Sequence, residues 1–128
     1  MRLSFLITKC LLEGDLASHF AKVPSAEGDA EPIVLREGAF EREARLPDGE
    51  RGTVPVDVLV VREVGADAEA VAIACERWVR SWPWERNAEE WPWRVVGIDT
   101  SAPRFKERDS SGRYVWGFVV TVTVVRGA

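Results

Sequence analysis

Histidine and cysteine are scarce in this chain, which contains one histidine, His19, and two cysteines, Cys10 and Cys75. A zinc or iron site needs several such ligands at short spacing, and this sequence does not supply them. The two cysteines are far apart and match no metal motif, so we expect buried, reduced thiols. The sequence predicts no metal and no other cofactor.

A nucleophile with its base is equally hard to find. Cys10 and His19 are the one thiol–imidazole pair worth weighing, but no motif positions either residue, and Cys10 falls on an apolar helical face. The acidic pair Glu41–Glu43 does not indicate a glycosidase, because strand alternation places it on a solvated face. The glycines form neither a phosphate-binding loop nor a dinucleotide fingerprint. We therefore predict that the protein is not an enzyme.

Long apolar runs are also missing. No stretch approaches the ~20 residues that cross a bilayer, so no contact with a membrane is expected. The first residues resemble a secretion signal, with Arg2 before an apolar stretch, but Thr8 and Lys9 interrupt it. No small-residue cleavage site follows Leu12, so we expect a product of the cytoplasm.

Positive charge is in deficit, with a formal net charge of −4. Residues 13–50 hold ten acidic and four basic side chains, a local balance of −6. Such a surface repels phosphate backbones, so specific binding to nucleic acid is not expected.

Among the features that are present, the first half of the chain predicts a helix followed by a hairpin. The length of 128 residues fits a single domain, 1–128. A helix is expected over about 3–13 and a short strand at about 19–23. Another strand begins near Ile33, with a bend or bulge at Gly38, and a Pro-Asp-Gly turn leads to a partner strand with alternating valines. Pro55 predicts that this partner lies at a sheet edge, or that the strand begins there.

The second half predicts a helix over about 68–81, capped by Asp67 and ended by Pro83. Its apolar stripe comprises Val71, Ala74, Cys75, Trp78, Val79 and Trp82, with Glu76 off the stripe. Strands follow at 93–99 and at 113–126. Together these elements predict an α+β fold: a largely antiparallel sheet of about four or five strands, packed with two helices.

The segment "PRFKERDSSGRYVW" reads as a hairpin that projects from the sheet as an arm. It forms a mildly positive patch on an acidic protein. One interpretation is a solvated hairpin; the other is an arm that pairs with the acidic part of a neighbouring subunit. For the second, the candidate interface residues are Arg104, Lys106, Arg108, Arg113 and Tyr114.

Tryptophans are concentrated in "SWPWERNAEEWPWR", residues 81–94. Trp78, Trp82 and Trp93 fall at core positions of the predicted helix and strand. Trp84 and Trp91 flank a polar loop, and we expect them to be partly exposed and to contribute to a subunit interface.

In element order and in its C-terminal third, the chain resembles the tail-terminator (minor tail, tail-completion) proteins of long-tailed bacteriophages and prophages. Three segments carry the likeness: the N-terminal helix with "PIVLREGAFERE" and its valine-rich partner, the "ADAEAVAIACERWVRSW" helix, and "WRVVGIDTSAPRFKERDSSGRYVWGFVVTVTVV". The WPW repeat is not part of that pattern.

The resemblance implies a structural virion protein of the phage tail or neck, made in the bacterial cytoplasm. It implies a homo-oligomeric ring, usually a hexamer, that caps the tail tube, ends its polymerisation and joins it to the head–tail connector protein. DNA would pass through the ring without specific binding. The alternative function is a small module that binds a peptide or carbohydrate by stacking on Trp84, Trp91 and Trp93.

Overall fold

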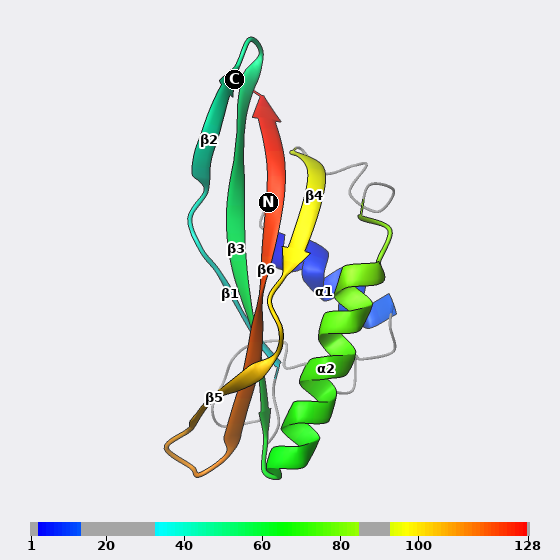
Figure 1. Cartoon of the computed structure of the whole chain (residues 1–128), viewed down its shortest axis with the longest axis vertical. Coiled ribbons are helices and arrows are strands. Elements are labelled where there is room, and N and C mark those ends of the chain that lie inside the picture. The colour runs from blue at the N-terminus through cyan, green and yellow to red at the C-terminus, as the bar shows by residue number, and fades with distance from the viewer. Residues whose placement is uncertain (1–2, 14–32, 85–92, 128) are drawn as a thin grey trace.

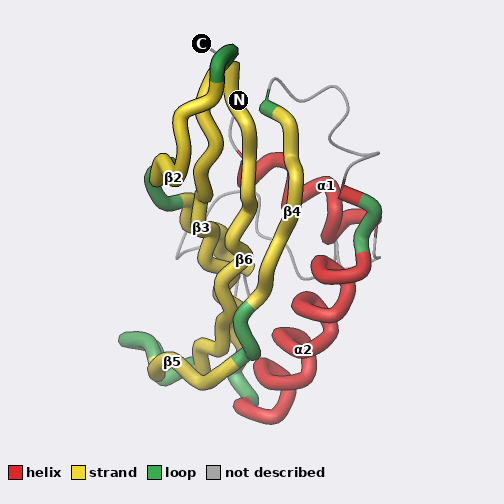
Figure 2. The backbone as a smooth tube through the Cα atoms, turned by 45° about the horizontal axis from the view of Figure 1, so that its top comes forward, coloured by secondary structure: helices red, strands yellow, loops and turns green. Residues whose placement is uncertain are grey.

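The computed structural model describes residues 3–13, 33–84 and 93–127, in which two helices lie on one side of an antiparallel sheet (Figures 1 and 2). The predicted α+β class is confirmed. The strand expected at 19–23 lies outside the described residues. The elements are α1 (Leu3–Glu13), β1 (Ile33–Glu37), β2 (Glu41–Leu46), β3 (Gly49–Arg62), α2 (Gly65–Ser81), β4 (Arg94–Thr100), β5 (Arg104–Arg108) and β6 (Tyr114–Gly127).

Two long strands, β3 and β6, form the centre of the sheet. They pair along their whole length, from Gly49↔Gly127 to Arg62↔Tyr114, without a register shift. β1 and β2 follow one another along the free side of β3, and β5 and β4 do the same along β6. The described sheet therefore has six strands, more than the four or five expected, because each of its edges is divided into two.

The core lies between the helices and the alternating valines of the central strands. Val54, Val56, Val58 and Val60 are at most 2% exposed, and so are Val120, Val122 and Val124 of β6. Each fully buried side chain of this kind contributes about 1.5–3 kcal/mol. The apolar stripe predicted for the first helix is buried as well, and it comprises Leu3, Leu6, Ile7, Cys10 and Leu11.

The buried face of α2 differs from the predicted stripe. Its buried residues are Ala68, Ala72, Cys75, Glu76 and Val79, whereas Ala74 is exposed. The helix has two partners, because it packs both on the sheet and on α1. The larger Trp78 lies at the flank of this buried face, where it reaches α1.

Of the two ends predicted for α2, only the C-terminal one is confirmed. Trp82 has extended dihedral angles (φ −67°, ψ 139°), so the prediction that Pro83 ends the helix is confirmed. The prediction that Asp67 is the N-cap is wrong, because β3 leads almost directly into the helix and Val64 is the N-cap. Asp67 lies in the first turn, where a carboxylate still favours the positive end of the helix dipole.

Pro55 does not lie at an edge or at the start of a strand, as its missing N–H suggested; it lies in the middle of β3. The carbonyl oxygen of Pro55 accepts a hydrogen bond from the Gly38 N–H, at the break between β1 and β2. In an antiparallel pair, the N–H and C=O of one residue face the same neighbour. The side of Pro55 that lacks an N–H therefore faces the break between β1 and β2, where no regular pattern of backbone hydrogen bonds is present. The predicted bend at Gly38 accommodates the proline.

Candidate functional site

The β5–β6 hairpin brings together five of the residues predicted for a subunit interface: Arg104, Lys106, Arg108, Arg113 and Tyr114. The hairpin itself is confirmed, and its projection as an arm stays a prediction. Its turn is shaped by Asp109, whose carboxylate accepts hydrogen bonds from the Ser111 and Arg113 backbone N–H groups. Gly112 completes the turn with φ 83°, a conformation that other residues rarely adopt.

Two of these cations stabilise the turn. The Arg113 guanidinium lies 2.7 Å from the Asp109 carboxylate. The Arg108 guanidinium donates to the Gly112 carbonyl oxygen at 2.8 and 3.1 Å and stacks 4.6 Å from the centre of the Tyr114 ring. Arg108 and Arg113 are therefore engaged within the hairpin.

These hydrogen bonds and the ion pair change the pKa of the Asp109 carboxyl group. Its partial desolvation would raise the pKa, but the Arg113 backbone N–H and guanidinium, together with the Ser111 N–H, hold the pKa of Asp109 below its usual range. The turn is therefore held by an ionised carboxylate at neutral pH.

The remaining residues of β5 form an exposed surface. Arg104 and Lys106 have no ion-pair partner within the described part of the chain. Between them lies Phe105, whose side chain is 48% exposed although its ring is close to those of Tyr114 (6.5 Å) and Trp116 (6.3 Å). Phe105 was not singled out from the sequence, and the available signal was a single aromatic residue inside a run of charged ones.

Val64 lies at the same end of the molecule and is 55% exposed. The next residue, Gly65, lies close to the Tyr114 ring: a Cβ atom added to Gly65 would be 3.2 Å from that ring. Val64 and Phe105 are the two exposed large hydrophobic residues of the described chain. We call the exposed edge formed by Arg104, Phe105 and Lys106, with Tyr114 and Val64 near it, the hairpin patch. Its two faces differ: Arg104 and Lys106 lie on the side of Gly117, whereas Phe105 and Tyr114 lie on the side of Trp116.

Trp84 does not belong to this surface. It is only 6% exposed, so the expectation that it is partly exposed is wrong. Its indole N–H donates to the Val79 carbonyl oxygen at 2.8 Å, and its ring meets Trp82 edge-on at 4.9 Å. It lies at the opposite end of α2 from the hairpin, and a 17-residue helix is roughly 25 Å long. Trp91, its expected companion, lies outside the described residues.

The other tryptophans of α2 hold the two helices together. The Trp78 indole N–H donates to the Cys10 carbonyl oxygen, and that of Trp82 donates to the Glu13 carboxylate, each at 2.6 Å. Both acceptors belong to the C-terminal part of α1, and the Cys10 carbonyl is one of its last four, which have no partner within the helix. The prediction that Trp78 and Trp82 pack against the core is confirmed.

Trp93 belongs to a cluster at the end of the sheet opposite the β5–β6 hairpin. The Arg126 guanidinium stacks 3.8 Å from the Phe40 ring centre and 5.5 Å from that of Trp93, and it forms an ion pair with Glu50 at 2.6 Å. Next to this cluster is a hollow of about 350 Å³ at the β2–β3 turn, with Arg45 among its lining residues. The alternative function of a ligand-stacking module is weakened, because Trp84 is buried and Trp93 stacks within the protein.

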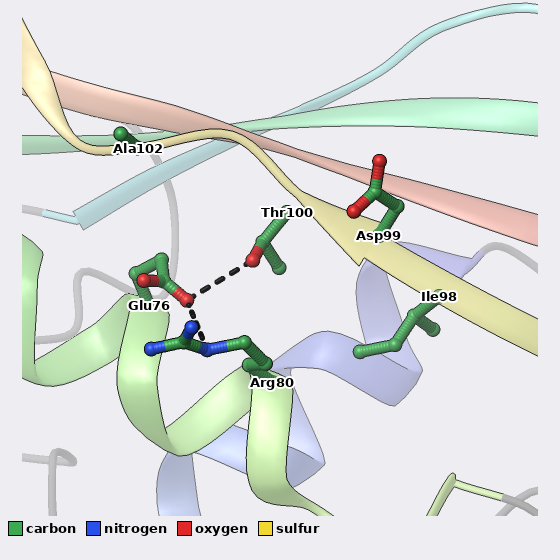
Figure 3. Close-up of a pocket in the computed structure, with 6 residues that line it drawn as sticks. All are labelled: Glu76, Arg80, Ile98, Asp99, Thr100 and Ala102. Atoms are coloured by element: carbon green, nitrogen blue, oxygen red, sulfur yellow. Dashed lines mark hydrogen bonds and ion pairs between the residues drawn. The ribbon is translucent and has the colours of Figure 1, made fainter.

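A second hollow, of about 360 Å³, lies between α2 and β4 (Figure 3). One carboxylate oxygen of Glu76 accepts a hydrogen bond from the Thr100 hydroxyl at 3.0 Å. The same oxygen forms an ion pair with the Arg80 guanidinium, also at 3.0 Å. The Asp99 side chain points away from this group (Figure 3). Glu76 was expected to lie off the apolar stripe of its helix but is only 8% exposed. These contacts explain how a carboxylate is accommodated there and join α2 to the edge strand β4.

The two cysteines are buried and unpaired. Burial, and secondarily the Glu13 carboxylate, raises the pKa of the Cys10 thiol far above its ordinary value. Burial raises the pKa of Cys75 to about 12. A catalytic thiol requires the opposite shift and access to substrate. Within the described residues, no three His, Cys, Asp or Glu side chains are grouped as metal ligands would be.

Comparison with known proteins adds no family. No protein-family model matches the chain, and no curated protein is detectably similar to it in sequence. Neither of the described helices has the length and apolar character that a membrane span requires.

Proposed function

We propose that this chain is a structural subunit that assembles with copies of itself into a closed ring. In this proposal the ring is of the tail-terminator type: it caps the tail tube of a long-tailed phage, ends tube polymerisation and joins the tube to the head–tail connector. It acts by stoichiometric binding, without catalysis, as part of the virion. The observation that supports it most directly is the hairpin patch, which combines an exposed aromatic ring with cations on a protein of net charge −4.

The chemistry of the described residues agrees with this proposal. Both thiols are inaccessible, and the Glu76 carboxylate is occupied by Thr100 and Arg80. The confirmed α+β class agrees with the fold that the resemblance implies. A ring requires a heterologous interface, in which one surface of a subunit meets a different surface of the next. A basic patch on an acidic chain provides the unlike surfaces that such an interface needs.

Self-association of the purified chain tests the proposal. Light scattering should detect a discrete oligomer as concentration rises, with a hexamer of 14.3 kDa chains weighing about 86 kDa (six times 14.3). Negative-stain images should show closed rings. A strictly monomeric protein at millimolar concentration would contradict the proposal.

Binding to the tube distinguishes a tail terminator from other ring-forming proteins. The proposal expects a tail-tube gene beside that of this chain, and the product of that gene should polymerise into shorter tubes when the ring is present, with rings at tube ends. Unchanged tube lengths and rings that do not bind the tubes would leave a ring-forming protein of another kind.

A further inference from the structure

β5 is an open edge of the described sheet. One side of the strand pairs with β6, and no described strand pairs with its other side. All five of its residues are exposed. An edge of this kind presents a row of N–H and C=O groups to which another strand can add.

The charge of β5 is opposite to that of the rest of the chain. Residues 104–108 contain three cations and one acid, a balance of +2, so the remainder of a chain of net charge −4 carries −6. Two copies of β5 side by side would place Arg104 and Lys106 near the same cations, and like charges across a strand pair are destabilising. The complementary surface is thus an acidic region elsewhere on another copy.

Phe105 supplies an apolar anchor at this edge. It is 48% exposed and is supported from within the protein by Tyr114 and Trp116. A pre-positioned aromatic ring that becomes buried on contact is typical of the residues that dominate binding energy at interfaces.

We propose that β5 is the docking strand for a second copy of this chain, in a head-to-tail contact. An extended acidic segment of the neighbouring copy adds to the free edge of β5 through backbone hydrogen bonds. Phe105 is buried in the contact, and Arg104 and Lys106 face acidic side chains of the neighbour. The proposal rests on the self-assembly put forward above and names the surface through which it occurs.

A pair of charge-matched double variants tests the role of β5. R104E/K106E changes the strand from +2 to −2, and R51E/R77E makes the same total change at cations that are exposed on β3 and α2. Light scattering across a concentration series should show that R104E/K106E raises the dissociation constant of assembly at least tenfold. R51E/R77E should change it less than threefold, and far-UV circular dichroism should show that both variants are folded.

Each other outcome is informative. A wild-type ring that R104E/K106E leaves intact overturns the docking role of β5 while the proposed function stands. Equal dissociation by both variants shows that net charge alone governs assembly, and this also overturns it. A wild-type chain that never associates refutes the proposed function together with the docking strand.

Hydrogen exchange tests the strand addition itself. The peptide covering residues 103–109 should exchange at least tenfold more slowly in the assembled state than in the diluted monomer, because new backbone hydrogen bonds protect its amides. Exchange that is equally fast in both states would contradict strand addition. Phe105→Ser should weaken assembly at least tenfold while leaving the monomer folded, since the side chain is half exposed.

Discussion

Shortening Trp84 should destabilise the fold by an amount that the structure allows us to work out in two steps. Trp84→Phe keeps an aromatic ring against Trp82 but removes the N–H that donates to the Val79 carbonyl oxygen. The loss of one such hydrogen bond costs about 0.5–1.5 kcal/mol. Trp84→Ala also removes the aromatic pair and leaves a cavity, and substitutions of this kind cost about 3–5 kcal/mol.

Urea unfolding followed by far-UV circular dichroism measures both changes without depending on tryptophan fluorescence. For urea slopes of about 1–3 kcal/mol per molar, a loss of 3–5 kcal/mol lowers the midpoint of Trp84→Ala by at least about 1 M. Arg77→Ala is the control in the same half of the helix; Arg77 is exposed, so this substitution should change stability by no more than about 0.5 kcal/mol.

A loss of less than about 1 kcal/mol for Trp84→Ala would contradict the burial of this side chain, because surface substitutions usually change stability by no more than about 0.5 kcal/mol. Trp84 would then be exposed in solution, as its position beside a polar loop first suggested, and it would again be a candidate for a ligand or subunit contact.

Three further predictions concern the polar and titratable groups. Thr100→Val should lower the free energy of unfolding by about 1.5–3 kcal/mol, because it removes a hydrogen bond to the buried Glu76 carboxylate. Urea unfolding should show a much smaller loss for the same substitution in a Glu76→Met background. Cys10 and Cys75 should react with a thiol reagent at pH 8 at least a hundredfold more slowly in the native protein than in denaturant, because both are buried; rapid native labelling would revive the thiol-enzyme hypothesis. The pKa of Asp109 is lower in the folded protein than in the unfolded chain, so its carboxylate stabilises the turn at pH values above the unfolded-state pKa, and this stabilisation is lost as the pH falls through the folded-state pKa. The amide chemical shifts of residues 108–113 should therefore titrate in acid, and Asp109→Asn should abolish that titration.

Local patterns in the sequence were sufficient for most of the secondary structure. Alternating valines predicted the two long strands, and the Pro-Asp-Gly turn predicted the hairpin between β2 and β3. Pro83 predicted the end of α2, because a proline restricts the residue before it whatever lies around it. These predictions held because each depends on interactions between residues that are close in sequence.

The misassigned residues depend on contacts that are distant in sequence. Pro55 was assigned to an edge because nothing local shows that β1 and β2 break opposite it. Glu76 was placed off the apolar stripe of α2 because its partner Thr100 lies 24 residues away, on a strand. Trp84 was placed at the surface because the pattern around Pro83 does not show that the chain folds back over Trp82.

The sequence alone determined an acidic chain with an α+β pattern, two cysteines without metal-type spacing and a cationic hairpin, since composition and periodicity are properties of the chain itself. Only the tertiary structure decided which aromatic residues are available to a partner. Trp84, expected at an interface, is buried beneath its own helix end, whereas Phe105, surrounded by charges, remains half exposed on an edge strand. Exposure depends on which elements pack together, and that packing joins residues of α1, α2 and the sheet that lie far apart along the chain.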